Sequence, residues 1–476
     1  MEVERVAVIG AGPCGLGVAK YLLAEQKFKS IAIFEQRDQP GGVWNYTGDE
    51  GINSTSTSAL ARPKPSQEPQ QPVGGTFASP VYDSLETNIP KSMMQFADYS
   101  FSADTALFPT HAVVKNYLHR YAEELLPYIR LQSLVLDVSL SKKNPKPEWT
   151  ITWRDLKTNE ILVKQFDAVL VANGHHNDPY IPNITGLAEW GRAYPGSIIH
   201  SSSYRRAGSF SNKKKKVIVV GHSASGIDIA NQIGRVSKHP LLISERTATT
   251  LSPEQVTISK SLPEISLLSI GERCVQFADG HEERDVDHIV FCTGYHFSIP
   301  FLSGVQPHIV TDGVRPHHLY QHVFYSKEPT LALIGFPQRI VPFPFSQAQG
   351  AWVARVLSGR LSLPSQVEME RWIGAWTVTR GEGRSFNTFG FPLDADYINS
   401  LYELSSYAAR VDGLDNDGHG KRPPFWGEKE KWTRARVPLI KKASQALGTR
   451  RGEIKTLEEL GFNFERDYVP DAEARL

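Results

Sequence analysis

A glycine-rich turn near the N-terminus carries the first residues suited to chemistry. Gly10, Gly12 and Gly15 have the GxGxxG spacing, and the carboxylate of Glu35 follows Gly15 by 20 residues. In a dinucleotide site the first glycine allows a tight turn, the second lets the backbone approach a pyrophosphate, and the third lets a helix pack closely. A carboxylate at the later position receives ribose hydroxyls. These residues predict a site for an adenine dinucleotide.

A second turn of the same kind lies near the middle of the chain. Gly221-x-Ser223-x-x-Gly226 has a serine for the middle glycine, which adds a side chain where backbone should approach phosphate. The serine hydroxyl can itself bond a phosphate oxygen. Arg246 follows Gly226 by 20 residues, and a guanidinium there pairs with the 2′-phosphate of NADPH. Glu245 beside it is the counter-indication, because a carboxylate prefers the free ribose of NADH. We favour NADPH.

The elements needed to position both turns are present. An apolar strand over residues 5–9 precedes the first turn, a helix follows it, and a strand over 31–35 ends in Glu35. A strand over 217–220 and a helix flank the second turn in the same way. Strands that alternate with helices predict an α/β fold with two Rossmann-like dinucleotide-binding domains on doubly wound sheets. We expect the first part of an FAD-binding domain over 1–190, an NADPH-binding domain over 191–325, and completion of the FAD domain with a C-terminal helical region over 326–476.

A short loop beyond Glu35 offers a surface for a flavin ring. Gly41 and Gly42 can lie flat against a ligand, and Trp44 supplies a planar face. The position favours contact with the redox ring, although a glycine turn with a packing tryptophan is the simpler alternative. Further along, an apolar strand over 287–291 is followed by Thr293-Gly294, where an FAD domain commonly closes over its cofactor.

In combination these motifs resemble the flavin-containing monooxygenases, class B enzymes that oxygenate soft nitrogen and sulfur atoms. The stretch Tyr194-x-Gly196-x-x-x-His200-x-x-x-Tyr204 is similar to the family's FxGxxxHxxx-aromatic pattern, with Tyr in place of the leading Phe. Tyr204 followed by Arg205 favours a flavin monooxygenase over a Baeyer–Villiger enzyme, which more often has Trp-Pro there. Residues 82–96, 171–187 and 346–365 resemble three further family blocks. The resemblance covers about residues 3–365 and points to soluble, fungal- or bacterial-like members.

The resemblance implies FAD and NADPH as cofactors, with O2 and a small-molecule substrate as reaction partners. NADPH reduces FAD, dioxygen adds at the flavin C4a, and an amine, hydroxylamine or thioether takes the distal oxygen of the hydroperoxide. It also places Asn88 beside the reacting edge of the flavin as the candidate catalytic residue; the alternative is a turn cap before Pro90. The residues expected to bind cofactor are Gly10, Gly12, Pro13, Gly15, Glu35, Gln36, Gly42, Val43, Trp44, Thr87, Asn88, Val135, Ser201, Ser202, Tyr204, Gly221, Ser223, Ala224, Ser225, Arg246, Thr293, Gly294 and Gln349.

Other functions remain open at this point. A Baeyer–Villiger-type or carbon-oxidising flavin monooxygenase would use the same folds. An NADP(H)-binding flavoprotein that acts as a sensor or scaffold without oxygenation is an alternative of another class. A disulfide reductase shares the double-dinucleotide layout, but the three cysteines form no CxxC pair.

Composition limits the remaining classes. Lys plus Arg (52) balances Asp plus Glu (51), so we expect neither nucleic acid nor a membrane surface as partner. No metal-ligand cluster is apparent, and no apolar stretch reaches the roughly 18 residues that span a bilayer. These features predict a cytoplasmic protein, and a homodimer is an open option. The ending Ala474-Arg475-Leu476 only loosely resembles a peroxisomal signal, and residues 47–80 are expected to form a long surface loop.

Overall fold

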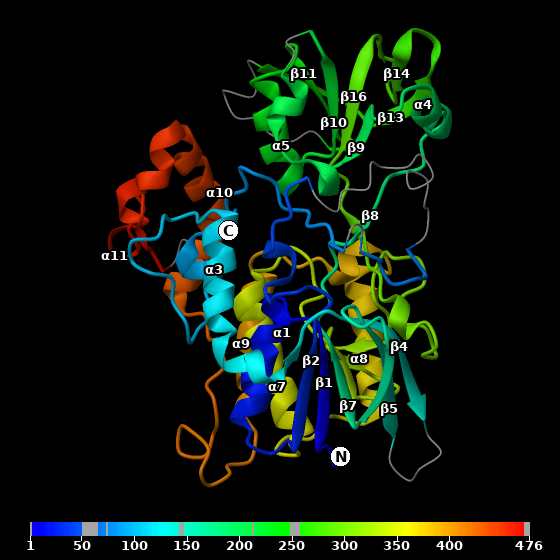
Figure 1. Ribbon diagram of the computed structural model, residues 1–476. Helices are drawn as coiled ribbons and strands as arrows, with labels where there is room; N and C mark the ends of the chain where they lie inside the picture. The colour runs from blue at the N-terminus through cyan, green and yellow to red at the C-terminus, as the bar shows by residue number, and fades with distance from the viewer. Residues whose placement is uncertain are drawn as a thin grey trace.

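Two α/β domains are stacked along the molecule, with C-terminal helices against the flank of the first (Figure 1). The computed structural model describes residues 2–49, 65–72, 75–141, 147–211, 214–247 and 258–470. Part of the predicted 47–80 loop and the Ala474-Arg475-Leu476 ending lie outside the described residues.

The first domain is built on a seven-stranded sheet in the order β18-β19-β20-β7-β1-β2-β3. Neighbours from β20 to β3 are parallel, whereas β18, β19 and β20 pair antiparallel. The strands are β1 (Arg5–Ile9), β2 (Ser30–Phe34), β3 (Ile129–Arg130), β7 (Ala168–Val171), β18 (Leu319–Tyr320), β19 (Phe324–Tyr325) and β20 (Leu331–Leu333). The chain therefore returns to this sheet shortly before the expected boundary at residue 326, and the domain division itself stays a prediction.

Helices cover one face of this sheet, and a small antiparallel sheet covers the other. Helices α1 (Pro13–Ala24) and α7 (Pro342–Leu357) cross closely, since a Cβ on Gly350 would lie 2.8 Å from the Cα of Val18. The small sheet comprises β4 (Ser133–Ser141), β5 (Glu148–Asp155) and β6 (Ile161–Phe166). Val6 of β1 faces the helical core and Ala7 faces the other core. This alternation fixes the strand and hence the turn at its carboxyl end.

The second domain has a five-stranded, wholly parallel sheet in the order β12-β11-β10-β16-β9. Helix α5 (Ala224–Gly234) packs on one face, and α4 (Leu187–Ala193) packs on the other with a small sheet. The strands are β9 (Ile198–His200), β10 (Lys216–Val220), β11 (Leu241–Ser244), β12 (Ser259–Leu262) and β16 (Val286–Phe291), and the small sheet contains β13 (Ile265–Ser269), β14 (Cys274–Phe277) and β15 (Glu282–Glu283). Two Rossmann-like sheets in one chain confirm the predicted fold class.

Two short strands mark the passage between the domains. β8 (Asp178–Pro179) and β17 (Tyr295–His296) pair antiparallel at this passage (Figure 1). The other helices are α2 (Lys91–Met94), α3 (His111–Tyr121), α8 (Gln366–Arg380), α9 (Leu393–Ser406), α10 (Glu428–Ala446) and α11 (Phe464–Asp467). Helices α10 and α11 lie on the flank of the first domain that α3 occupies, close to the passage between the domains.

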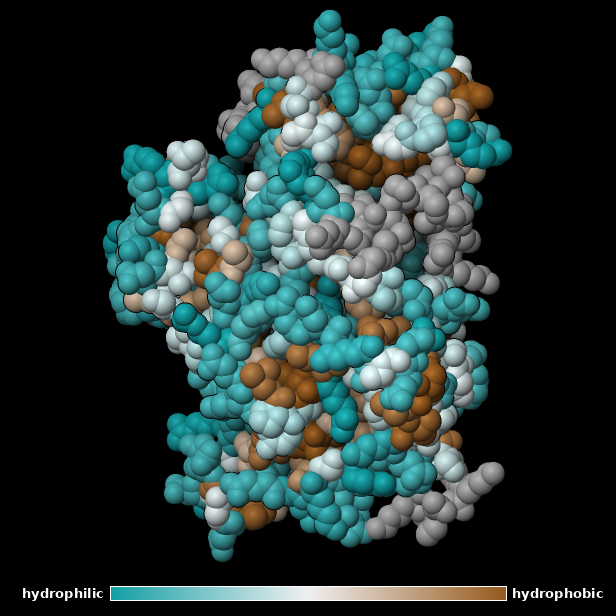
Figure 2. Space-filling model, viewed as in Figure 1, coloured by the Kyte–Doolittle hydropathy of each residue, from teal (hydrophilic) through white to brown (hydrophobic). Residues whose placement is uncertain are grey.

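The surface is mainly hydrophilic. On the face in Figure 2, hydrophobic residues gather in several separate patches rather than in one continuous band. Among the described residues, no helix is both long and apolar enough to cross a membrane.

Candidate active site

The first glycine turn has two positions where the protein itself leaves no room for a side chain. Gly10 has φ +108°, and a Cβ there would lie 2.5 Å from the carbonyl oxygen of Ala172. A Cβ on Gly15 would lie 1.8 Å from the oxygen of Gly10. Gly12 differs, because its φ is −76° and the nearest atom to an added Cβ is the Cα of Gly42 at 3.6 Å. A side chain at Gly12 would therefore not clash with the protein, but it would obstruct a ligand that approaches the turn.

The start of α1 and the loop after β2 meet at this turn. Gly12 precedes α1 and Pro13 is its first residue, so the positive end of the helix dipole faces outward. The N–H of Gly41 donates to Ala11 O at 2.8 Å, and Gly42 has φ +58°. Val43 and Trp44 follow in a short 3-10 turn, with Val43 O accepting from the hydroxyl of Ser79. The first loop and the Gly41–Trp44 segment therefore form one continuous surface.

Glu35 is fixed at the end of β2 by the same turn. Its carboxylate accepts the N–H of Ala11 and the N–H of Arg37, each at 2.9 Å. Burial raises the pKa of Glu35, while these two bonds, a bond from the N–H of Gln36 and the Arg37 charge oppose that rise. A carboxylate has about four lone-pair sites, so it retains acceptor capacity for ribose hydroxyls. Val135 is buried in the adjacent strand β4.

The second turn repeats the geometry of the first. Gly221 has φ +89°, and a Cβ on Gly226 would lie 2.0 Å from Gly221 O. Ser223 directly precedes α5 and is exposed, as are Ala224 and Ser225. The Ser223 side chain does not cap its helix among the described residues, so its hydroxyl is available to a phosphate. The substitution of serine for glycine thus preserves the turn.

Glu245 and Arg246 have opposite surroundings although they are neighbours. Glu245 is buried, accepts the hydroxyl of Ser261 at 2.7 Å, and lies 3.7 Å from Nδ1 of His222. The Arg246 side chain is 77% exposed and pairs with Glu264 at 3.2 Å. Both residues line a cavity of about 280 Å³. The guanidinium is the group within reach of a ligand in this cavity, whereas the carboxylate is bonded within the protein.

A group of neutral histidines surrounds Tyr295 at the passage between the domains. The rings of His176 and His200 lie 5.3 Å and 5.2 Å from the ring of Tyr295. Burial lowers the pKa of each of these histidines to about 4, and lowers that of His175 well below its usual value. At neutral pH this region therefore carries no imidazolium charge.

His200 organises the turn that contains the predicted serines. Its Nδ1 accepts the N–H of Ser202 at 3.1 Å, and its Nε2 donates to Gly294 O at 3.0 Å. Ser201 is buried and bonds the Tyr295 hydroxyl. Thr293 donates its hydroxyl to Tyr180 O. His200 therefore has a structural role that joins the ends of β9 and β16.

Tyr204 and Gln349 are both engaged within the protein. The Tyr204 hydroxyl donates to Oε1 of Gln232 at 2.9 Å. The Gln349 oxygen accepts the N–H of Gly335 at 2.8 Å, and its amide nitrogen donates to the Tyr397 hydroxyl at 3.1 Å. In this structure the polar groups of Tyr204 and Gln349 bond other protein groups and so support the site rather than face a ligand.

Asn88 is exposed at a bend, and its amide makes no hydrogen bond to any residue that the structure describes. Thr87 before it is buried, and its hydroxyl donates to Ile89 O at 3.0 Å. Thr87, rather than Asn88, thus bonds across this bend. The Asn88 amide is available to a ligand.

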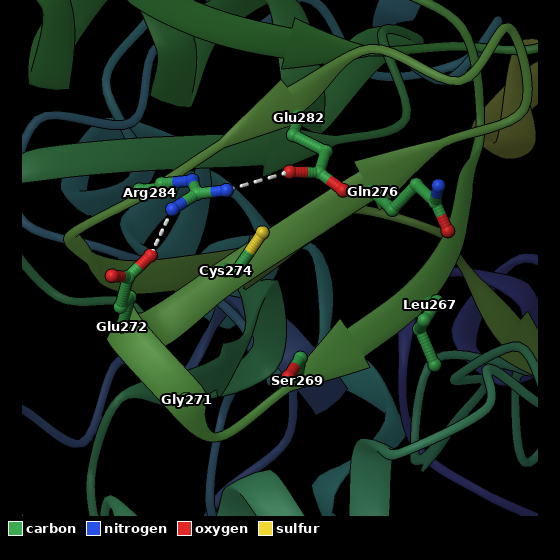
Figure 3. Close-up of a pocket in the computed structure, with 8 residues that line it drawn as sticks. All are labelled: Leu267, Ser269, Gly271, Glu272, Cys274, Gln276, Glu282 and Arg284. Carbon is green, nitrogen blue, oxygen red and sulfur yellow. Dashed lines mark hydrogen bonds and ion pairs between the residues drawn. The ribbon is translucent and has the colours of Figure 1, made fainter.

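A separate pocket of about 330 Å³ lies on β13–β15 (Figure 3), and its lining residues belong to neither turn. Arg284 lies between Glu272 and Glu282, so its charge is already paired. Burial is the largest of the causes that raise the pKa of Cys274, and the thiol stays protonated. No group of three His, Cys, Asp or Glu residues able to hold a metal ion occurs in the described ranges.

The sequence model of the flavin-binding monooxygenase-like family matches residues 72–256 and 253–412. The chain belongs to that family. A second model, the NAD(P)-binding Rossmann-like domain, matches residues 8–60. This member of the flavin-binding monooxygenase-like family is accordingly an enzyme, a flavin-dependent monooxygenase with FAD and NADPH as cofactors and O2 and a small molecule as substrates.

Individual proteins that are similar to this chain support the assignment. The flavin-containing monooxygenase FMO GS-OX-like 2 of Arabidopsis thaliana is 36% identical over 77% of this chain and 76% of its own length. The thiol-specific monooxygenase of Saccharomyces cerevisiae is 31% identical over 90% of both chains. Among solved structures, S-allyl-L-cysteine S-oxygenase from Allium sativum aligns with a TM-score of 0.77 and 29% identity over 96% of both chains.

The first turn also fits FAD on structural grounds. A pyrophosphate needs backbone without side chains at a helix N-terminus, which Gly12 and the opposing Gly42 provide next to the start of α1. Sequence patterns missed the groups that support the Asn88 segment from the C-terminal helices, in particular Lys441, because a lysine among other lysines on a helix gives no distinctive pattern.

Proposed function

We propose that this monooxygenase transfers one oxygen atom of O2 to the sulfur of a small thioether, with a soft amine or hydroxylamine as the second substrate class. The family assignment, together with the sulfur-oxygenating proteins among the similar chains, carries this proposal. Burial lowers the pKa values of His176 and His200 to about 4, so these two imidazoles add no positive charge beside Tyr295 at neutral pH. The S-oxygenase and the thiol-specific monooxygenase among the similar proteins support sulfur over nitrogen.

The roles of individual residues follow from their positions. Gly10, Gly12 and the start of α1 would hold the FAD pyrophosphate, and Glu35 would hold the ribose. The start of α5 with Ser223 would hold the NADPH phosphates, and Arg246 the 2′-phosphate. When bound, NADPH supplies the hydride and FAD accepts it and activates dioxygen.

Asn88 would act at the reacting edge of the flavin. Its amide is neutral at all working pH values and both donates and accepts hydrogen bonds. A carboxylate in that place would add charge to a site that works on neutral substrates. Since the amide has no partner within the described residues, it can orient the substrate without first breaking a bond.

A competition between three probes tests the proposal. Purified FAD-loaded protein is mixed with NADPH and, in separate reactions, methyl phenyl sulfide, N,N-dimethylaniline or cyclohexanone. We expect the sulfoxide to be the main product, and the N-oxide to form more slowly. Lactone as the main product would replace the proposal with a Baeyer–Villiger activity, and hydrogen peroxide alone would indicate a protein that no longer oxygenates. A homodimer and a cytoplasmic location stay predictions from the sequence.

A further inference from the structure

The C-terminal helices reach the candidate catalytic segment. The family's sequence model ends at residue 412, yet α10 lies beyond it and contacts the segment that contains Asn88. Ile440 of α10 packs with Leu107 and Phe108, and the N–H of Leu107 donates to Ile454 O at 2.7 Å. This tail is therefore docked on the 86–110 segment through both apolar and backbone contacts.

Lys441 makes the most direct contact. Its Nζ donates to Thr87 O at 2.8 Å, lies 3.7 Å from the Glu86 carboxylate, and sits 4.3 Å from the centre of the Phe108 ring. Arg451 from the same tail donates to both oxygens of Glu86, at 3.0 Å and 2.9 Å. Only 14% of the Lys441 side chain is exposed. Two cations from the tail thus converge on the two residues that precede Asn88.

The backbone sets the position of Asn88, because its own amide has no hydrogen bond among the described residues. Thr87 is held on one side by the bond from its N–H to Pro109 O at 2.9 Å, and on the other by Lys441. Removal of the Lys441 charge leaves Thr87 O without that donor. The bend that carries Asn88 then has one fewer restraint.

The same cations also act on the second domain. Asp228 of α5 accepts hydrogen bonds from Tyr82, a residue of the first domain, and from Gln232. Burial raises the pKa of Asp228, whereas the Tyr82 bond and the charges of Lys441 and Arg451 lower it. Lys441 is therefore placed where the Asn88 segment, the tail and the NADPH-binding domain come together.

We propose that Lys441 is a positioning residue for oxygenation, which holds the Thr87–Asn88 peptide so that reducing equivalents from NADPH end in product rather than in hydrogen peroxide. The inference rests on the proposed function. A structural role alone would lower thermal stability and FAD retention but would leave the division between product and peroxide unchanged.

Three variants test this inference. Lys441→Met keeps an unbranched apolar side chain but removes the charged donor and with it the Nζ contact with Phe108, and Lys441→Arg restores a charged donor. Lys442→Met is the matched control, because Lys442 is the exposed neighbour on the same helix. For each FAD-loaded protein, sulfoxide and hydrogen peroxide are measured per NADPH consumed, with methyl phenyl sulfide as probe. Hydrogen–deuterium exchange of a peptide covering residues 84–92 is measured alongside.

We expect Lys441→Met to raise peroxide per NADPH by about 3- to 10-fold, the scale for the loss of one ordinary net hydrogen bond. Flavin reduction should stay within about twofold of wild type, since the hydride-transfer partners are unchanged. Exchange in the 84–92 peptide should be faster, Lys441→Arg should recover most of the coupling, and Lys442→Met should match wild type.

Wild-type coupling in Lys441→Met would overturn the inference, whatever happens to thermal stability, as would an equal effect from Lys442→Met. If the wild-type protein itself yields no sulfoxide, the proposed function fails. The exchange measurement then still decides the inference, because unchanged exchange over residues 84–92 in Lys441→Met would show that Lys441 does not restrain the bend.

Discussion

Gly12→Ala should weaken FAD binding without destabilising the protein that carries no FAD. The backbone at Gly12 is extended, with φ −76° and ψ −176°, so alanine adopts it without strain. An added Cβ would have only an ordinary contact at 3.6 Å, to Gly42. Whatever the substitution costs in FAD affinity must therefore come from the ligand that approaches the turn.

The two effects of this substitution on the protein alone nearly cancel. Loss of glycine freedom in the unfolded chain stabilises by about 0.4–1 kcal/mol, and alanine is poorer than glycine before a helix by a similar amount. A methyl group forced into a close pyrophosphate contact costs about 1–3 kcal/mol. The dissociation constant for FAD should therefore rise by about 5- to 150-fold.

The assay compares thermal stability without FAD and FAD affinity by quenching of flavin fluorescence. Gly374→Ala is the matched control, since Gly374 lies exposed in α8 with nothing within 4 Å of an added Cβ. Gly15→Ala supplies the contrast: its Cβ would lie 1.8 Å from backbone, so the protein itself should lose about 3 kcal/mol or more. FAD affinity within twofold of wild type in Gly12→Ala would refute the placement of the pyrophosphate.

Three further outcomes are expected. Arg246→Ala should raise the KM for NADPH by about 10-fold and barely change that for NADH in steady-state assays; equal losses would indicate a structural role. Asn88→Ala should leave flavin reduction near normal in stopped-flow traces, while product falls by about 10²-fold and peroxide takes its place. Glu283→Gln should destabilise the protein to urea at pH 7. Bonds from His281 and Lys216 outweigh burial and lower the pKa of Glu283 from 4.5 to about 2, so the stabilisation is present at neutral pH and is lost as the pH falls through about 2.

The parts of the fold that sequence predicts are those specified by local spacing. The spacing of Gly10 and Gly15 is typical of a strand–turn–helix unit. At both positions an added Cβ would clash with neighbouring backbone, so glycine is required. The apolar strands before and after each turn are likewise local. The packing of the β4–β6 sheet against β1 and the packing of α7 on α1 join residues more than 100 positions apart, and no short sequence pattern records such pairs.

The candidate site divides in the same way. The spacing of the glycines predicted the two turns. It could not show that the Gln349 amide bonds Gly335 and Tyr397, nor that Lys441 donates to Thr87 O, a residue 354 positions away. These contacts depend on where helices dock. Helix docking depends on the shapes of the helices and on the apolar area that they bury together. A single polar residue at the docked surface produces no periodic pattern in the sequence.

The pair Glu245–Arg246 shows how side-chain direction can favour one of two cofactors, NADPH or NADH, between which the sequence alone leaves a balance. Both residues stand at the distance from their turn at which a ribose is recognised, and their charges favour opposite cofactors. At the end of a strand successive side chains point to opposite sides, so only one of two neighbours can face the cavity freely. Glu245 points inward to Ser261 and His222, and Arg246 points outward. The Glu245 carboxylate is already engaged by the Ser261 hydroxyl and lies near His222, whereas the exposed guanidinium of Arg246 can attract a 2′-phosphate. This arrangement supports the use of NADPH. The support comes from the directions of the two side chains, since their charges sum to zero.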